Sequence, residues 1–177
     1  MLVPQTEKGL TGKGFEFLAE MERMHMIVDV SHLSDKGFWD IVEHGTRPFA
    51  ASHSNCRALA PHTRNLTDEM IRALSERGGI AGLNYYAPFL DTDPTHPENC
   101  RSTVELIAKH AAHYKQVGGA QMIALGSDFD GIDGPHQLEN AAFLPLLADA
   151  LRKEGFTEDE VEGIYYRNAM RFFEENL

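Results

Sequence analysis

Two histidines occupy equivalent places in the sequence, each directly after a serine that follows a short apolar run. His32 comes after the run Met26–Val30, and His53 comes after the run Pro48–Ala51. Neutral imidazole is a good zinc ligand, and two successive strands that each end in a histidine indicate that both rings point to one place. We therefore predict that His32 and His53 bind a divalent metal ion. The alternative is that each ring is buried and hydrogen-bonded to the backbone.

A glycine-flanked turn carries a candidate acid–base residue. Asp128 lies within Gly126–Gly131, and such a turn lets the backbone come close to a ligand. An aspartate there can serve as a metal ligand, as a base, or as an acid that delivers a proton to a leaving amine. The alternative is an Asx turn, in which the carboxylate only stabilises the loop.

An arginine in the long loop beyond His53 is a candidate for binding an anionic substrate group. The guanidinium of Arg64 has the planar geometry that binds a carboxylate through two parallel hydrogen bonds. Arg57 competes for the same role, and a solvated loop arginine is the alternative for either residue.

These side chains converge if the chain folds as alternating strands and helices. Four apolar runs predict strands, at Met26–Val30, Pro48–Ala51, Ile80–Leu83 and Met122–Leu125. Helical spacing and capping residues predict helices at Thr11–His25, Ser34–His44, Thr67–Arg77, Ser102–Lys115, Pro145–Lys153 and Thr157–Leu177. This alternation predicts an α/β protein with a parallel sheet and flanking helices, in which the strands' carboxyl ends share one face. The polar residues that follow the four strands are His32, His53, Asn84 and Asp128.

Two further histidines, His110 and His113, are three residues apart on a predicted helix. This spacing can bind a metal, but we expect that helix face to be the outer, solvated one. Neither histidine is therefore counted in the predicted site.

Composition excludes several classes of function. The 177 residues suit one domain, 1–177, and the net charge of −11 argues against nucleic acid and against an anionic membrane surface. No apolar run approaches the ~20 residues of a membrane span, and the segment Met1–Lys8 is short and largely polar, so no signal peptide is expected. Cys56 and Cys100 form no paired framework. We therefore expect a cytoplasmic protein.

Four ordered stretches resemble a known family, the membrane (renal-type) dipeptidases of peptidase family M19. They are Met26–His32, Ala51–Arg57, His62–Leu66 and Gly126–Gly131. Their order and spacing are also similar, and the resemblance covers nearly the whole chain. It implies a (β/α)₈ TIM barrel of the metal-dependent hydrolase type with two zinc ions, which hydrolyses the peptide bond of dipeptides by means of a metal-activated water.

The resemblance also implies roles for single residues. His32 and His53 match two zinc ligands of the family. Asp128 matches the aspartate that handles the proton when the tetrahedral intermediate collapses, and Arg64 matches the arginine that binds the terminal carboxylate of the dipeptide.

The chain departs from the family in the other metal ligands. The family has a His-x-Asp pair on its first strand and a bridging glutamate on a middle strand, whereas no His-x-Asp occurs here. A full barrel takes about 250 residues and eight strands. We therefore expect the carboxyl-terminal half of the barrel, with about four strands and at most one partial zinc site.

Three functions follow from this expectation. The first is a zinc-dependent dipeptidase, incomplete in this chain. The second is a catalytically inactive half-barrel that self-associates or binds another protein, because half a barrel leaves open strand edges. The third keeps the enzyme class but changes the substrate to another amide or lactam bond. The expected partner is a second copy of the chain or a missing amino-terminal half.

Overall fold

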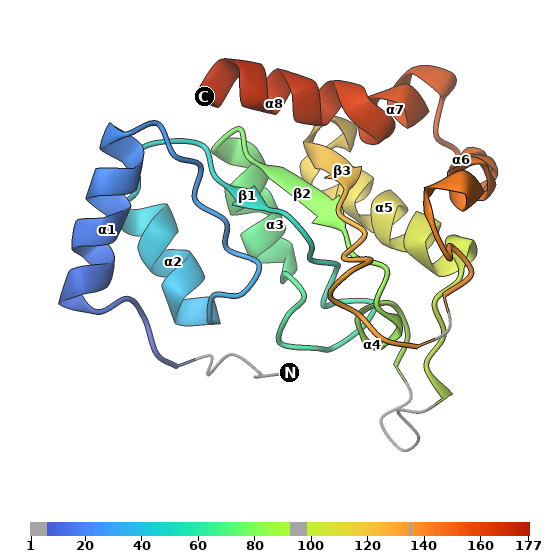
Figure 1. Ribbon diagram of the computed structural model, residues 1–177, viewed down its shortest axis with the longest axis horizontal. Coiled ribbons are helices and arrows are strands. Elements are labelled where there is room, and N and C mark those ends of the chain that lie inside the picture. The colour runs from blue at the N-terminus through green and yellow to red at the C-terminus, as the bar shows by residue number, and fades with distance from the viewer. Residues whose placement is uncertain (1–6, 93–98, 135) are drawn as a thin grey trace.

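The computed structural model describes residues 7–92, 99–134 and 136–177 (Figure 1). Its helices are α1 (Gly12–Arg23), α2 (Asp35–His44), α3 (Asp68–Glu76), α4 (Ala87–Leu90), α5 (Val104–Gly118), α6 (Leu144–Lys153), α7 (Glu158–Glu162) and α8 (Asn168–Asn176). Two 3₁₀ turns, η2 (Ala120–Met122) and η3 (Ala141–Phe143), and one π-helical turn, η4 (Gly163–Arg167), join them. The strands are β1 (Ala50–Ala51), β2 (Ile80–Leu83) and β3 (Ile123–Leu125).

The three strands form one parallel sheet in the order β1-β2-β3 (Figure 1). This arrangement confirms the predicted α/β class with helices between parallel strands. Three strands do not by themselves form the closed (β/α)₈ barrel that the resemblance implies.

The prediction of a strand at Met26–Val30 is wrong. The segment runs beside β1 and makes a single parallel bridge between Asp29 and Ala50, with the Val30 amide donating to the Ala50 carbonyl over 2.8 Å. The physical reason is that the segment lies at the edge of the sheet, where Met26 is half-exposed. The Asp29 carboxylate there accepts a hydrogen bond from the Ser52 amide. The described residues therefore form three strands and a bridged segment in place of the four strands expected.

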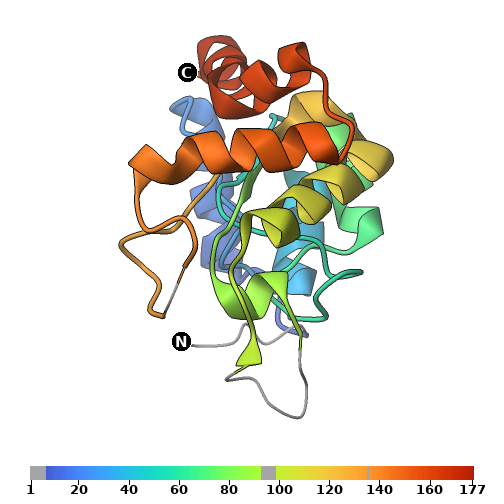
Figure 2. The same cartoon turned by 90° about the vertical axis from the view of Figure 1, so that its right-hand side faces the viewer.

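Helices cover both faces of the sheet. The main core joins one sheet face to α3, α5 and α6, and α6 packs against α5 (Figure 2). On the other face a smaller cluster forms where Phe172 of α8 contacts Ala50, Ile80 and Ala124. Both faces being apolar explains why the strands read as continuous hydrophobic runs.

The carboxyl ends of the strands approach one another closely. A side chain at Gly82 or at Gly126 would overlap the carbonyl oxygen of Ser52. The Ser54 amide also donates to the Gly82 carbonyl over 3.0 Å, which extends the pairing beyond β1. These contacts hold the segment after β1 against the ends of β2 and β3.

Capping residues fix most helix starts as the sequence predicts. Thr67 accepts a hydrogen bond from the Met70 amide, and Thr157 forms a capping box with Glu160. The predicted helix start at Ser102 is wrong by one residue, because Thr103 caps α5 and the Ser102 hydroxyl donates to the Tyr85 carbonyl over 2.6 Å.

His110 is not on a solvated face. It is 1% exposed, its Nδ1 accepts from the Cys56 amide over 3.1 Å, and its Nε2 donates to the Leu90 carbonyl over 3.1 Å. Burial lowers the pKa of His110 to about 4. The expectation failed because the loop that carries Cys56 packs on this side of α5. The neighbouring His113 pairs with Asp68 at the start of α3 over 2.7 Å.

A membrane-spanning segment is not found among the helices of the described residues, since none of them combines the necessary length and apolarity.

Candidate metal centre

The structure brings His32 and His53 together at the carboxyl edge of the sheet. His32 follows the segment that is bridged to β1, and His53 comes two residues after β1. Their Nε2 atoms lie 2.9 Å apart, and their ring centroids lie 4.9 Å apart. Two nitrogens from different segments therefore face one point.

A carboxylate and a hydroxyl fix the tautomer of His53. Asp29 accepts hydrogen bonds from the Ser31 amide over 3.1 Å, from the Ser52 amide over 3.0 Å and from the Ser52 hydroxyl. The single proton of that hydroxyl is directed at Asp29, so the 2.7 Å contact between Ser52 Oγ and His53 Nδ1 must be an Nδ1–H donating to the oxygen. The lone pair of His53 is then on Nε2, where it accepts a hydrogen bond from the Nε2–H of His32.

The charge state of these groups supports this arrangement. Desolvation alone would raise the pKa of Asp29, but the hydrogen bonds from Ser52 and Ser31 outweigh it and lower the pKa, so the carboxylate is ionised. Partial burial lowers the pKa of His32, and the charge of Arg64 lowers it further. Burial is also the main cause that lowers the pKa of His53. Both rings are therefore neutral at pH 7, the state in which imidazole binds a metal.

The donor set fits one zinc ion in part. Two imidazole nitrogens on a tetrahedral zinc lie about 3.3 Å apart, given zinc–nitrogen distances of ~2.0–2.1 Å. The observed 2.9 Å between Nε2 of His32 and Nε2 of His53 is a hydrogen-bond distance and is shorter than this separation, so the two rings would move slightly apart to hold one ion. Zinc sites normally have three or four protein ligands, so this pair supplies two of them.

Asp128 lies next to the histidines on a strained turn. Its backbone has φ of 70°, and the Gly131 amide donates to its carbonyl over 2.9 Å. Its Oδ2 accepts from Asn84 Nδ2 over 3.1 Å. Within the described residues no backbone amide of the turn donates to this carboxylate, so the Asx-turn alternative is not what the structure shows. The charge of Asp128 acts on both histidines, raising their pKa against the effect of burial.

Arg64 is buried beside the same histidines. It is 2% exposed, its Nε donates to the Ser31 carbonyl over 2.5 Å, and its guanidinium lies over the Phe89 ring at 5.2 Å from the centroid. Burial and position exclude the alternative of a solvated loop arginine. Its charge reaches His32 and His53, whose pKa values it lowers.

Arg57, the competing arginine, is engaged elsewhere. Its guanidinium makes two hydrogen bonds to Asp35 at the start of α2, over 2.6 and 2.8 Å, and a third to the Asn65 carbonyl over 2.8 Å. Arg57 thus fixes the loop to α2, and Arg64 is the arginine that faces the site.

Sequence reasoning missed three residues around the site. Asp29 and Ser52 orient His53, and the buried amide of Asn55 donates to the carbonyls of Asn84 and Phe89 over 2.9 and 3.2 Å. A signal for Asp29 was present, because it is the single charged residue within an otherwise apolar run. Asn55 and Ser52 had no distinguishing signal, since both lie in a polar loop.

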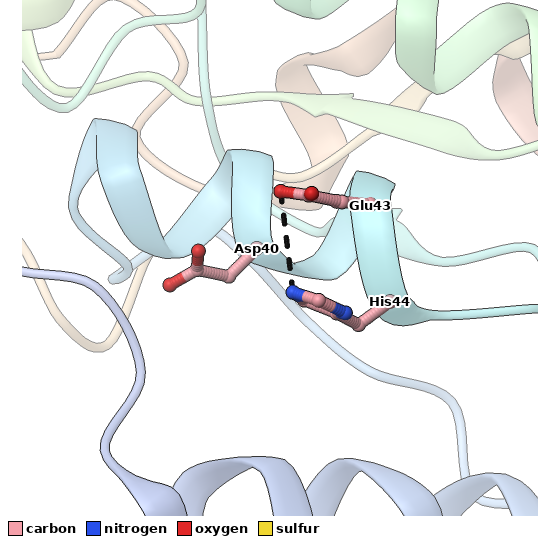
Figure 3. Close-up of side chains that lie close together, drawn as sticks. All are labelled: Asp40, Glu43 and His44. Atoms are coloured by element: carbon pink, nitrogen blue, oxygen red, sulfur yellow. Dashed lines mark ion pairs between the residues drawn. The ribbon is translucent and has the colours of Figure 1, made fainter.

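A second group of metal-ligand types lies on α2 (Figure 3). Asp40, Glu43 and His44 have ligand atoms within 4.8 Å of one another, and His44 Nε2 is 3.9 Å from Glu43. Asp40 already accepts from the Leu10 amide over 2.7 Å and pairs with Lys36. Glu43 and His44 are exposed. The group is a set of neighbours on one helix, and no second feature indicates a ligand.

Imidazole, carboxylate and guanidinium groups gather at the carboxyl ends of parallel strands, where α/β enzymes carry their active sites. This combination of groups is typical of the metal-dependent hydrolases. Comparison with known proteins gives the family. The chain belongs to the membrane dipeptidases, peptidase family M19, whose model matches residues 2–176. This match confirms the resemblance found in the sequence.

Relatives and solved structures agree with this assignment. A Klebsiella pneumoniae protein, named as an uncharacterized protein in the pqqA 5' region, is 38% identical over 95% of this chain and 61% of its own length. Dipeptidase tcpJ of Claviceps purpurea is 33% identical over 94% of this chain and 38% of its own length. A metallo peptidase of Rhodobacter sphaeroides, solved with a phosphinate mimic of the dipeptide L-Ala-D-Ala, superposes with a TM-score of 0.89 at 32% identity.

Coverage is unequal in these comparisons. The Rhodobacter sphaeroides structure covers 99% of this chain, and this chain covers 50% of that structure. The dipeptidase AC structure, with a TM-score of 0.87 and 33% identity, shows the same two values. The chain therefore spans about half the length of these solved structures and between 38% and 61% of the curated relatives.

Proposed function

We propose that this chain carries the carboxyl-terminal half of a zinc-dependent dipeptidase barrel, with one half of its metal centre. The observation that carries the proposal is the 2.9 Å approach of the Nε2 atoms of His32 and His53, with the lone pair of His53 aimed by Asp29 and Ser52. Family membership supports metal use and a dipeptide substrate. Zinc is proposed because both donors are imidazoles.

When bound, zinc would polarise the peptide carbonyl and lower the pKa of a water molecule. The residues of the chain supply the rest. His32 and His53 would hold the ion. Arg64, already desolvated and fixed to the Ser31 carbonyl, would bind the terminal carboxylate of the dipeptide.

Asp128 would handle the proton. Its carboxylate is held by Asn84 and shares the same sheet edge as the two histidines. A general acid–base residue must lie within reach of the atoms that exchange the proton, and the convergence of the strand ends provides that proximity. The dipeptide amine would leave as Asp128 returns the proton.

The proposal is tested by zinc binding and hydrolysis measured side by side. We expect the purified chain to bind zinc and the His53→Ala variant to lose this binding. We expect any hydrolysis of Ala-Ala by the native chain to be lost in the same variant. Addition of the first half of a related M19 chain should increase hydrolysis in the native chain only. Equal turnover by the native chain and His53→Ala would refute the site.

Arg64→Lys separates the binding role of Arg64 from metal binding. The lysine keeps the charge but not the two-pronged geometry, so KM for the dipeptide should rise by about tenfold or more, with zinc affinity retained. A dipeptide amide, which lacks the terminal carboxylate, is the matched control, because its KM should respond little to this change. An equal rise for both substrates would exclude the carboxylate-binding role.

A second candidate function is self-association of an inactive half-barrel. The observation in its favour is that the segment 26–30 makes one bridge to β1, with Met26 half-exposed. On β3 the Ile123 carbonyl accepts from Asn168 over 2.8 Å, which protects that strand. Association would therefore use the segment 26–30, and a monomer in sedimentation at micromolar concentration would exclude it.

A further inference from the structure

A buried amide connects two parts of the candidate site. Asn84, directly after β2, has no exposed surface. Its Nδ2 donates to Asp128 Oδ2 over 3.1 Å and to the His53 carbonyl over 3.4 Å. One side chain therefore contacts both the residue proposed to handle the proton and the backbone of a proposed metal ligand.

The orientation of this amide is fixed from behind. Asn84 Oδ1 accepts from the Tyr86 amide over 2.7 Å. A backbone N–H can only donate, so the oxygen must face Tyr86 and the nitrogen must face Asp128. The backbone of Asn84 is fixed as well, because its amide donates to Asn55 Oδ1 over 3.0 Å and its carbonyl accepts from Asn55 Nδ2 over 2.9 Å.

The amide treats the two oxygens of Asp128 differently. Oδ2 accepts the N–H of Asn84, which occupies one of its lone pairs and fixes the orientation of the carboxylate. Oδ1 lies over Gly131, where a Cβ would overlap it. The absence of a side chain at Gly131 therefore leaves room for Oδ1 in this orientation.

We propose, on the basis of the proposed function, that Asn84 is a positioning residue that makes Oδ1 of Asp128 the oxygen that carries the proton. In hydrolysis, the water oxygen bonds to the peptide carbon and the C–N bond breaks. One proton of that water passes to Oδ1 and then to the leaving nitrogen, so the carboxylate ends as it began. Asn84 binds Oδ2 and so holds the carboxylate in one orientation on its turn, with Oδ1 as the oxygen that exchanges the proton.

The first test needs no enzymatic activity. In the native chain the side-chain amide hydrogens of Asn84 should exchange slowly with water, as followed by NMR of the ¹⁵N-labelled protein. Asp128→Ala should accelerate this exchange by about tenfold, because a hydrogen bond to a charged acceptor is lost. Asp130→Ala is the matched control, since Asp130 is exposed on the same turn. Equal exchange in the native chain and Asp128→Ala would overturn the inference.

The second test uses two variants of Asn84 under the conditions in which the native chain hydrolyses Ala-Ala. Asn84→Ala removes the whole amide, and Asn84→Leu keeps a side chain of similar size without charge and without the donor to Asp128. Both should lower kcat by about tenfold or more and leave KM and zinc affinity close to native. Unchanged kcat in a folded variant would overturn the inference. Slow amide exchange that depends on Asp128, together with no hydrolysis by any form, would instead refute the proposed function.

Discussion

Two regions of this molecule combine histidine with carboxylates, and they differ in how the side chains are brought together. At the sheet edge, His32 and His53 come from separate segments, and Asp29 acts through Ser52 to aim the lone pair of one ring. On α2, Asp40, Glu43 and His44 are neighbours because they are three and four residues apart on one helix. The difference teaches that the proximity of suitable residue types is not by itself evidence of a binding site, whereas a ring nitrogen oriented by its neighbours supports one.

The burial of the two regions points the same way. In the α2 group the buried carboxylate is occupied by Lys36 and the Leu10 amide, while the histidine is in solvent. At the sheet edge both imidazoles are kept neutral by burial and by the nearby charge of Arg64. A cation entering the α2 group would have to compete with Lys36 for Asp40, whereas neither His32 nor His53 is in an ion pair with another of the described residues.

The largest expected effect is on zinc affinity, measured in matched histidine variants of the two regions. His53→Ala should weaken zinc binding by at least ~100-fold, because half of the ligand pair is removed. His44→Ala, the matched change on α2, should alter the dissociation constant by less than about twofold, in the range of unlinked surface changes. Competition against a chromophoric chelator measures both. A greater loss in His44→Ala would reverse the comparison.

A smaller effect is expected from the hydroxyl that aims the ring. Ser52→Ala leaves His53 Nδ1 without its acceptor and frees the ring to change tautomer, which should weaken zinc binding by about 10-fold to 100-fold. The ¹⁵N shifts of His53 should change from one tautomer to a mixture.

Ser54→Ala provides the control for this change. It makes the same substitution two residues further on, at a hydroxyl without a hydrogen-bond partner among the described residues. If Ser54→Ala weakened zinc binding as much as Ser52→Ala, the relay from Asp29 would have no special role.

The smallest effect on metal binding should come from His110, whose burial is structural. Its folded pKa of about 4 lies below the unfolded value, so the unfolded chain binds the proton first as the pH falls below ~6.5. The free energy of unfolding should therefore be constant above that pH and decrease towards acid, by about 2 kcal/mol between about pH 7 and pH 5 from this residue.

His110→Gln should flatten that dependence. Glutamine can still accept from the Cys56 amide and donate to the Leu90 carbonyl, so the packing role is preserved. Urea unfolding at the two pH values measures the change, and zinc affinity at neutral pH should stay native. An unaltered pH dependence in His110→Gln would show that this histidine is not the group responsible.

Much of the architecture could be predicted from the sequence because it depends on local signals. The helices begin at capping residues such as Thr67 and Thr157, and the apolar runs at 80–83 and 123–125 form strands. The segment Met26–Val30 failed because a strand needs partners as well as composition, and here the bridge to β1 is its only pairing in the described chain.

The residues of the candidate site could be predicted from the sequence, whereas the hydrogen bonds between them could not. The expectation that strand ends converge on one face of a parallel sheet brings His32, His53 and Asp128 together without any coordinates. The choice between Arg64 and Arg57 needed the position of Asp35, which only the packing of α2 supplies. The relay from Asp29 and the contact of Asn84 with Asp128 depend on register between segments, which spacing along the chain does not encode.

The close approach of Gly82 and Gly126 to the Ser52 carbonyl limits how this protein can diverge. Alanine is the smallest replacement, and it already collides with main-chain atoms that cannot rotate away. We therefore expect glycine to be required at both positions. The distance between the histidine-bearing loop and the ends of β2 and β3 is set by main-chain contacts, and the surrounding side chains are less constrained.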